Sequence, residues 1–480
     1  MDRRKILLTA LALIFIAGFL LRFFPVRGGY HYWDETVYLQ HAEILSGESP
    51  DNYNEFDFRP PLFSLILAGV FLISSSLISA HLAVAGLSSL VIVLVYIIGQ
   101  ELYSRETGII AAAVYAASPM AIILSHDILV DPILPIFWLL TAFSLVKALK
   151  SEKRIYFLLT GLMASLAVLM KFTSLVVVPA VAVTVLIYRF KDKWNDRERV
   201  IEGIKDFMSD RSNWLMVLGF ILGFTPYLLW SFLEFGSPIH VFIEAWDKSG
   251  ARDAFLTYLK GWNSYILIPL YLGIPLFFRK MDLSKMENYL PVIFFLSLYV
   301  PLQFLVGNKE TRFIMPILPF MVLIVAEGLR KLRSGEIFQN IKLSKSVFAF
   351  LIISSLIMLP TSIPERNVFV QGLETQWEAP VMDAGNWLNE NTEEEAVVYT
   401  NYQYPALGYY SKRDIVWFRE YVPIDDVIGE EIQEPGYLYY SSNSPYPHPS
   451  LKELELDSRF ELEETFGNTS YIFYYSGDLR

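Results

Sequence analysis

The stretch ILLTALALIFIAGFLLRFF, residues 6–24, is followed after five residues by YHYWDETVY, residues 30–38. The first run is long enough to cross a hydrocarbon core about 30 Å thick. The second places two adjacent carboxylates, Asp34 and Glu35, among aromatic residues beside that membrane. Of the 480 residues, 54% are hydrophobic and 19% are charged, and the apolar ones come in long blocks. In lipid, backbone hydrogen bonds must be satisfied within the protein, and apolar runs of this length can satisfy them only as helices. We therefore predict an all-α polytopic membrane domain.

Twelve apolar segments are candidate spans. They cover residues 6–24, 61–78, 81–102, 108–124, 132–149, 155–170, 173–188, 214–235, 264–278, 290–306, 313–329 and 346–359. The segment 192–213 between two of them has the pattern of an amphipathic surface helix. We expect the first segment to be a retained signal anchor, because it is long and lacks a small-residue cleavage site.

Clusters of Lys and Arg fix the orientation of the spans, because such clusters stay in the cytoplasm. They lie at residues 3–5, 150–154, 189–199, 279–285 and 330–345. All five clusters fall on one side only if Pro61–Ile78 does not cross, so we predict that it is re-entrant or lies in the outer leaflet. Eleven crossings then remain, with a cytoplasmic N-terminus. The alternative is that this segment crosses and a weak span such as Ile155–Met170 does not.

The last 120 residues differ in charge from the rest. Thr361–Arg480 holds 22 acidic and 7 basic side chains, which leaves +4 of the total charge of −11 for the remainder. This balance argues against nucleic-acid binding. Strand patterns at 395–399, 414–418, 437–440 and 471–475 alternate with helix patterns at 383–391 and 404–410, which is typical of a small α/β domain. We therefore predict a transmembrane domain at 1–360 and an external soluble domain at 361–480, in a protein of the plasma membrane.

With eleven crossings, the external side collects many of the charged residues near helix ends. They are Asp34 and Glu35 after Trp33, Arg59, His126 and Asp127 after Ser125, Asp131, Lys171, the loop 236–262, and the run Asn308-Lys309-Glu310-Thr311-Arg312. Any one of them is typical of an interfacial anchor. Charges at this depth are costly unless they are paired or hydrated, so their convergence indicates a functional site.

The residue types in this set suit transfer of a sugar from a phosphate leaving group. Asp34 is the candidate base that takes the proton of an acceptor hydroxyl. Glu35 points about 100° away on a helix, so its expected role is to orient and to raise the proton affinity of its neighbour. The external cations that could hold the leaving phosphate are Arg59, Lys171, Lys309 and Arg312. The alternative for the last two is a plain loop in which they pair with Glu310.

His126, Asp127 and Asp131 allow two interpretations. A histidine and two carboxylates could hold a divalent metal, although such a group is more often a hydrogen-bonded orienting cluster. We therefore expect no cofactor, with a metal as the alternative. Because Asp131 precedes Pro132, it is also a candidate helix N-cap. The chain contains no cysteine, which excludes disulfides, thiolate metal sites and a thiol nucleophile.

These motifs together resemble a known superfamily. Trp33-Asp34-Glu35, Arg59-Pro60-Pro61-Leu62, Ser125–Pro132 and Lys171–Ser174 resemble the GT-C glycosyltransferases, and within them the protein O-mannosyltransferase and aminoarabinose-transferase-like enzymes. Residues 308–319 are similar to a late mannosyltransferase signature. Asn308 replaces its usual histidine, and Arg59 stands where the aminoarabinose branch often has lysine.

The resemblance, over residues 30–330, implies roles for four residues: Asp34 as the catalytic carboxylate, Asp131 as a second carboxylate, and Arg59 and Arg312 as basic groups, the latter at the donor phosphate. It also implies a polyprenyl- or dolichyl-phosphate sugar donor, drawn from the membrane lipid.

Two functions follow from the sequence. The first is an inverting glycosyltransferase whose acceptor hydroxyl belongs to a protein, a lipid or a glycan on the external face. The second is a flippase or transporter of lipid-linked sugars. The spans carry few charges at mid-depth, and the charged residues gather on one face, which favours chemistry at a surface over passage through the membrane. A sensor with an acidic partner-binding tail is a third, weaker reading.

Overall fold

The computed structural model of the chain describes residues 3–24, 33–47, 59–190, 209–247, 258, 265–266, 268–279, 281–306, 309–334, 379–418, 425, 428, 432, 434–444 and 448–477. They form two compact units. The first unit takes in Met1–Val26, Phe56–Phe63 and His81–Val370, and the second takes in Arg27–Glu55, Ser64–Ala80 and Gln371–Arg480. Predictions that concern residues 30–32, 192–208, 308 and 346–359 lie outside the described residues, and the domain boundary at 360 stays a prediction.

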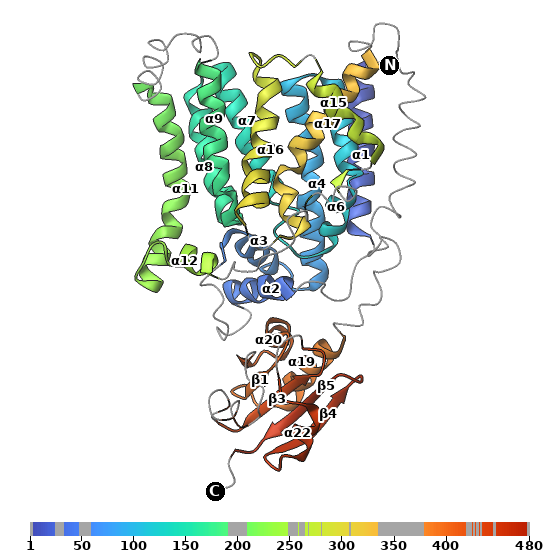
Figure 1. Cartoon of the computed structure of the whole chain (residues 1–480), viewed down its shortest axis with the longest axis vertical. Coiled ribbons are helices and arrows are strands. Elements are labelled where there is room, and N and C mark those ends of the chain that lie inside the picture. The colour runs from blue at the N-terminus through green and yellow to red at the C-terminus, as the bar shows by residue number, and fades with distance from the viewer. Residues whose placement is uncertain are drawn as a thin grey trace. The chain divides into compact units, whose positions relative to one another are not determined.

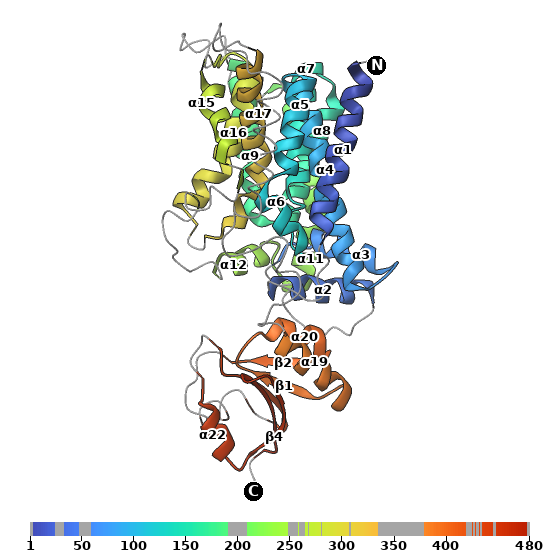
Figure 2. The same cartoon turned by 90° about the vertical axis from the view of Figure 1, so that its right-hand side faces the viewer.

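The first unit is a helix bundle in which α7, α8, α9, α11, α16 and α17 run side by side (Figures 1 and 2). Its α-helices are α1 Arg3–Phe23, α4 Leu77–Leu102, α5 Arg105–Ala116, α6 Pro119–Ile123, α7 Pro135–Ser151, α8 Arg154–Met170, α9 Val177–Phe190, α11 Arg211–Phe235, α12 His240–Asp247, α15 Gly273–Phe278, α16 Met286–Phe304 and α17 Leu318–Ser334. Its 3₁₀ turns are η2 Leu124–His126, η3 Phe172–Val176, η4 Ile268–Leu272 and η5 Thr311–Ile317.

Several of these helices are long and apolar enough to cross a membrane. In the described part of the chain there are five, or six if a bent pair counts as one span. They are Lys5–Phe23, Leu77–Leu102, Phe172–Phe190, Arg211–Phe235 and Thr311–Ser334, with Arg105–Ala116 plus Pro119–His126 as the bent pair. The multi-span helical membrane domain is thus confirmed, while the figure of eleven crossings stays a prediction. Helix α3, Leu62–Phe71, has ten residues, about 15 Å, which agrees with a segment that does not cross alone.

Two predicted spans are wrong as continuous helices. Instead of one helix over 108–124, α5 stops at Ala116 and the chain bends by 61°. The cause is local: Ser118 caps the next helix by accepting a hydrogen bond from the Ala121 N–H, and Pro119 fits its first turn. The predicted span 264–278 contains only η4 and the six-residue α15 among its described residues. Pro269 and Pro275 each remove a backbone donor there.

Glycines bring α8 and α11 into direct backbone contact. A Cβ added at Gly161 would lie 1.8 Å from the Met216 carbonyl oxygen, and one at Gly219 would lie 2.1 Å from the Leu158 carbonyl oxygen. No real side chain fits at either position, so α11 can pack this closely on α8 only because both residues lack a Cβ. Such small-residue crossings are a common way for helices to associate in lipid, where burial of apolar surface drives nothing.

Charged and polar contacts tie many helix ends together at one end of the bundle. They include Lys147–Glu101 at 2.6 Å between α7 and α4, Tyr188 to the Leu149 carbonyl at 3.0 Å between α9 and α7, Arg189–Asp210 at 2.5 Å between α9 and the start of α11, and Arg333–Glu106 at 2.6 Å between α17 and α5. We call this the basic end. The predicted cytoplasmic clusters at 150–154, 189–199 and 330–345 therefore start at the same end of the bundle.

The second unit contains a five-stranded mixed sheet in the order β2-β1-β3-β5-β4. The strands are β1 Val397–Thr400, β2 Asp414–Trp417, β3 Gly436–Ser441, β4 Phe460–Phe466 and β5 Ser470–Tyr475. Strand β1, the second in this order, is parallel to both neighbours, with Val397 opposite Asp414 and Val398 opposite Tyr437. Strands β3, β5 and β4 pair antiparallel. The expected small α/β region is thus present as a mixed sheet with helices.

Alternation along the strands builds a core on each face of this sheet. Val398 and Tyr439 face α19 Ala379–Asn391 and α20 Tyr404–Ser411, in one cluster with Leu388 and Leu407. The neighbouring residues on the same strands face the opposite side. They pack with Leu454 of α22, Leu451–Leu456. This period of two is what a strand buried on both faces requires.

Helix α2, Trp33–Ser46, belongs to the second unit and packs on α20. Lys412, at the C-terminal cap of α20, forms an ion pair with Glu43 of α2. A Cβ at Gly408 of α20 would lie 3.7 Å from the Gln40 amide nitrogen, so the two helices touch along their faces. Residues far apart in sequence thus form one body: the helix that carries Asp34 is packed against the C-terminal domain.

Candidate functional site

Three segments at the end of the bundle opposite the basic end bring charged side chains together. Asp131 lies in the turn just before α7, Lys171 is the C-cap residue of α8, and Arg312 is the second residue of η5. Lys171 has an extended backbone, with φ −158° and ψ 124°, which ends α8 there. Since α7 and α8 are joined at the basic end by a two-residue link, the start of α7 and the end of α8 meet at the far end.

Asp131 is the centre of this cluster. Its Oδ1 accepts a hydrogen bond from the Lys171 Nζ at 2.8 Å. Its Oδ2 lies 3.9 Å from Nη1 of Arg312 and has no hydrogen-bond partner in the described structure. Only 1% of the aspartate is exposed. A buried carboxylate is stable when cations compensate it, so the two basic residues are held where Asp131 places them.

Glu310 completes the cluster from the same segment as Arg312. It accepts two hydrogen bonds from the guanidinium, at 2.6 Å from Nε and 3.1 Å from Nη2. The four side chains carry two positive and two negative charges, so the cluster is balanced as it stands. Exposure differs sharply within it: 9% for the Arg312 side chain against 35% for Glu310. Glu310 is therefore the member that a ligand can displace at the least cost.

Phe313 supports both cations with its ring. The Nζ of Lys171 lies 4.2 Å from the ring centroid, and the guanidinium carbon of Arg312 lies 5.6 Å from it. A cation over an aromatic face is stabilised by about 0.5–2 kcal/mol, depending on its hydration. Sequence reasoning named Phe313 only as part of a signature. Its position directly after Arg312, three residues before Pro316, was the available signal.

The N-cap prediction for Asp131 is wrong. Helix α7 begins at Pro135, and its N-cap residue is Leu134, with no side-chain hydrogen bond at the cap. The residues between form a turn, which leaves the aspartate three positions too early to reach the first helical N–H groups. Its carboxylate is used for the pair with Lys171 instead.

His126 and Asp127 are both buried. The His126 Nε2 lies 2.8 Å from the Leu21 carbonyl oxygen and donates to it, which ties η2 to α1. Among the described residues, no group of three or more His, Asp or Glu side chains has the arrangement of a metal site. His126 thus has a structural role in joining η2 to α1, and its predicted role in substrate binding stays a prediction.

The other predicted residues lie in different surroundings. Asp34 and Glu35 form the first turn of α2 in the second unit, where the N-terminal end of the helix favours negative charge. Glu35 is fully buried at 1% exposure, whereas Asp34 is half-buried, so the two neighbours do face different ways. Arg59, just before Pro60, and Lys309, just before Glu310, are half-buried in the first unit. The roles assigned to all four stay predictions.

Arg22 was missed by sequence reasoning. It is buried in α1, where it donates to the carbonyl oxygens of Gly18 at 2.9 Å, Ala116 at 3.2 Å and Tyr115 at 3.1 Å. The last two carbonyls lie at the C-terminal end of α5, where the chain breaks, and that of Tyr115 also accepts from the Ser118 N–H at 3.1 Å. The available signal was an arginine inside an otherwise apolar span. Charged residues in such spans almost always pair with other charged groups or with backbone carbonyls.

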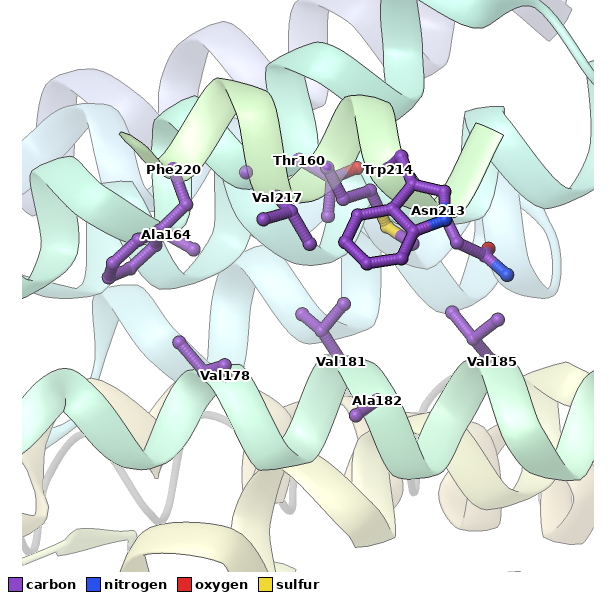
Figure 3. A pocket seen from close by; sticks show the side chains of 12 residues that line it. Thr160, Ala164, Val178, Val181, Ala182, Val185, Asn213, Trp214, Val217 and Phe220 are labelled. Carbon is purple, nitrogen blue, oxygen red and sulfur yellow. The ribbon is translucent and has the colours of Figure 1, made fainter. Parts of the chain in front are cut away.

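An apolar groove of about 310 Å³ lies between α8, α9 and α11 (Figure 3). Val178, Val181 and Val185 of α9 face Trp214 and Val217 of α11 across it. Thr160 and Asn213 are the polar residues of its lining. The walls offer dispersion contacts and few hydrogen bonds, which suits a hydrocarbon chain.

Two family models match the chain. Residues 58–230 match the dolichyl-phosphate-mannose-protein mannosyltransferase family, and residues 253–404 match the Alg9-like mannosyltransferase family. The chain is a membrane glycosyltransferase with a fold of the GT-C type. The first match covers Arg59, Asp131 and Lys171, and the second covers Glu310 and Arg312, so both halves of the charged cluster fall in matched regions. No curated protein matches the chain.

Solved structures share the fold of this GT-C glycosyltransferase. ArnT from Cupriavidus metallidurans, bound to undecaprenyl phosphate, is similar with a TM-score of 0.67 at 13% identity, over 100% of this chain and 99% of that one. The oligosaccharyltransferase AglB from Archaeoglobus fulgidus, in complex with an inhibitory peptide and a dolichol-phosphate, matches at 0.59 and 13%, over 92% and 70%. Mycobacterial arabinofuranosyltransferase AftD matches at 0.58 and 13%, over 100% and 42%.

Proposed function

We propose that this GT-C glycosyltransferase is an inverting enzyme that moves one monosaccharide from a polyprenyl- or dolichyl-phosphate donor to an acceptor hydroxyl. The observation that carries the proposal is the pair of cations, Lys171 and Arg312, organised by the buried Asp131 at one end of the bundle. Lysine and arginine at fixed positions suit a phosphate leaving group. The bound lipid phosphates of ArnT and AglB belong to those proteins, and they support the same donor class here.

The proposed face is the external one. The basic end carries the Lys and Arg clusters that the positive-inside rule assigns to the cytoplasm. The charged cluster is at the other end of the same helices, so it would face the outside. The N-terminus would then be cytoplasmic, and a donor would reach the cluster from within the bilayer, with its tail in lipid or in an apolar groove.

Each residue has a defined task in the proposed reaction. Asp34, by its sequence context, takes the proton of the acceptor hydroxyl as the acceptor oxygen bonds to the anomeric carbon. The bond from that carbon to the phosphate oxygen breaks, and its electron pair stays on the phosphate. Arg312 and Lys171 stabilise this developing charge, which matters most where water is excluded. Asp131 acts through the two cations as a positioning residue.

Entry of the donor phosphate would displace Glu310 from Arg312. The cluster is charge-balanced without substrate, so the monoanionic phosphodiester of the donor, and the more negative phosphate that leaves after transfer, are accommodated best when the most exposed carboxylate moves away. Glu310→Gln should therefore strengthen donor binding several-fold, since the neutral amide competes less well for the guanidinium. Lys171→Met should weaken donor binding at least tenfold, because one charge-assisted contact contributes about 1.5–3 kcal/mol.

The test is a transfer assay on the purified protein with a radiolabelled polyprenyl-phosphate sugar, in which donor and acceptor concentrations are varied separately. Lys150→Met serves as the matched control, because Lys150 is a helix-end lysine paired with Glu101 at the basic end. We expect a raised donor KM in Lys171→Met only. Normal donor kinetics in that variant, or movement of the labelled lipid between leaflets with no transfer, would refute the proposal.

Asp34→Asn tests the base separately. Loss of transfer with unchanged donor binding supports the assignment, because removing a general base lowers the rate by about 10²–10⁴-fold. A purified Asp34→Asn protein that transfers sugar at the normal rate would exclude it.

A further inference from the structure

The sheet of the second unit has a topological switch point at β1. The chain leaves β1 through α20 and returns in β2 on one side, and β3 then pairs on the other side of β1. All three strands are parallel, so their carboxyl ends share one edge of the sheet. In open α/β sheets, ligands bind in the crevice outside the carboxyl ends of the strands at such a point.

A cavity of about 310 Å³ lies at this point. Tyr402 and Gln403, which follow β1, form one wall, and Ser441 and Asn443, at the end of β3, form another. Thr469, in the turn between β4 and β5, contributes a third. The volume is at the small end of the range for ligand pockets, roughly 300–1,000 Å³, which suits one or two sugar rings.

Hydrogen bonds within the protein fix the walls of the cavity without a ligand. The Asn401 amide bridges the strand ends: its Nδ2 donates to the Ser441 carbonyl at 2.9 Å, and its Oδ1 accepts from the Ser441 N–H at 2.9 Å. The Thr469 carbonyl accepts from the Ser442 N–H at 2.9 Å, which fixes the β4–β5 turn against the end of β3. Such preorganisation lowers the entropic cost of binding a polar ligand.

The chemistry of the lining is neutral and polar. It consists of hydroxyl groups, two primary amides, two phenols and a proline, with no charged side chain among the lining residues. Hydroxyls and amides both donate and accept hydrogen bonds, which suits a ligand rich in hydroxyl groups. The Tyr439 hydroxyl at the floor pairs with Ser470 at 3.0 Å, and burial raises the pKa of this tyrosine to about 12, so it stays neutral. A phosphate or carboxylate would find no counter-charge here.

We propose that this cavity binds a neutral saccharide and that the acceptor of the transferase is a glycan held there. The acceptor role rests on the proposed function. The binding of a saccharide in the cavity does not depend on it. Helix α20 begins beside Gln403 of the cavity, and Lys412 at its other end pairs with Glu43 of α2. One helix thus connects the saccharide site to the helix that bears Asp34, within a single compact unit.

The first test measures binding by saturation-transfer difference NMR on the full-length protein in nanodiscs, with no lipid donor present. The probes are α-mannobiose, chosen because the matched families are mannosyltransferases, and glucuronic acid as a single anionic sugar ring. We expect saturation transfer to α-mannobiose and none to glucuronate. An absence of signal from α-mannobiose and from a panel of neutral disaccharides, or equal signal from glucuronate, would overturn the proposal.

The second test uses substitutions at the rim. Asn443→Ala removes an exposed amide, and Thr469→Val removes a hydroxyl without a change of shape; each should weaken binding about five- to tenfold, as expected for one or two hydrogen bonds. Asn391→Ala is the matched control, because Asn391 is an exposed amide at the far end of α19. Unchanged binding in both rim variants would overturn the site.

A third measurement separates this proposal from the proposed function. In transfer assays the rim variants should raise the KM for a glycan acceptor and leave the KM for the donor unchanged, whereas Lys171→Met does the opposite. If the rim variants bind saccharide poorly yet use the acceptor normally, the acceptor role fails and the binding site remains. If Lys171→Met transfers normally, the proposed function fails and saccharide binding is unaffected.

Discussion

Removing the charge of Asp131 tests whether the cluster is one coupled unit. Asp131→Asn keeps the shape of the side chain and an oxygen for the 2.8 Å contact with Lys171, but it loses the charge that holds two cations in a nearly dry site. Hydrogen bonds to charged groups contribute about 1.5–3 kcal/mol, and breaking a buried pair costs about 3–5 kcal/mol. Since 20% of the lysine side chain is exposed and Arg312 keeps Glu310, the lower figure applies, about 2 kcal/mol.

The assay is a double-mutant cycle on the purified protein, with unfolding followed by SDS titration in mixed micelles. Asp131→Asn and Lys171→Met should each destabilise by about 2–3 kcal/mol, because each leaves the other partner buried without full compensation. The double variant should cost about 2 kcal/mol less than the sum of the two. Additivity within about 0.5 kcal/mol, the limit for independent sites, would refute the coupling.

Further predictions concern packing, donor recognition and pH. Gly161→Ala should destabilise the bundle by several kcal/mol and Gly86→Ala should not, as thermal unfolding in detergent will show, because a Cβ fits only at the second position. Arg312→Lys should raise the donor KM about tenfold in the transfer assay, because lysine cannot reproduce the forked guanidinium contact. The Arg459 hydrogen bonds lower the pKa of Asp457 below its unfolded value near 3.9, so this pair stabilises the second unit above that pH and stops doing so as the pH falls through the folded-state pKa. Arg459→Leu should therefore reduce the stability of the second unit at pH 7 and flatten its loss below pH 4, measured by limited proteolysis across pH.

Much of the helical architecture could be predicted because hydrophobic length is read directly from the residues. The helix breaks could not be placed, because they depend on where a cap meets a proline, as at Ser118 and Pro119. The short helix α15 likewise results from prolines within an apolar run. In these cases the apolar run continues unbroken through the sequence while backbone donors are missing at single positions.

In the C-terminal region, four of the strands were predicted close to their observed positions. Strand β4 was missed because its sequence, Phe460-Glu461-Leu462-Glu463-Glu464-Thr465-Phe466, is acidic and exposed on the solvent side. It is an edge strand, and charged side chains are what protect such an edge from pairing with another chain. From its composition alone, this run is predicted to be a loop. The short capped helix α22 was missed as well.

For the charged cluster, the sequence predicted the members, and as an alternative the pairing of Arg312 with Glu310, but not the contacts with Asp131. Lys171, Asp131 and Arg312 were named as external charged groups, and the structure brings these three together. Their pairing depends on the far ends of α7 and α8 meeting η5, and no local pattern encodes a contact over 40 or 180 residues. The pair of Arg312 with Glu310 is part of the alternative that the sequence offered for this loop.

The ion pair between Glu43 and Lys412 spans 369 residues of sequence. A ribosome therefore finishes α2 long before it makes the helix against which α2 packs. Until α20 is made, the helix that bears Asp34 lacks the surface on which it packs. Closing so long a loop then slows the packing of α2 on α20. Under the role proposed for Asp34, the transferase would stay inactive throughout its own synthesis, when an unfinished enzyme could otherwise consume donor lipid.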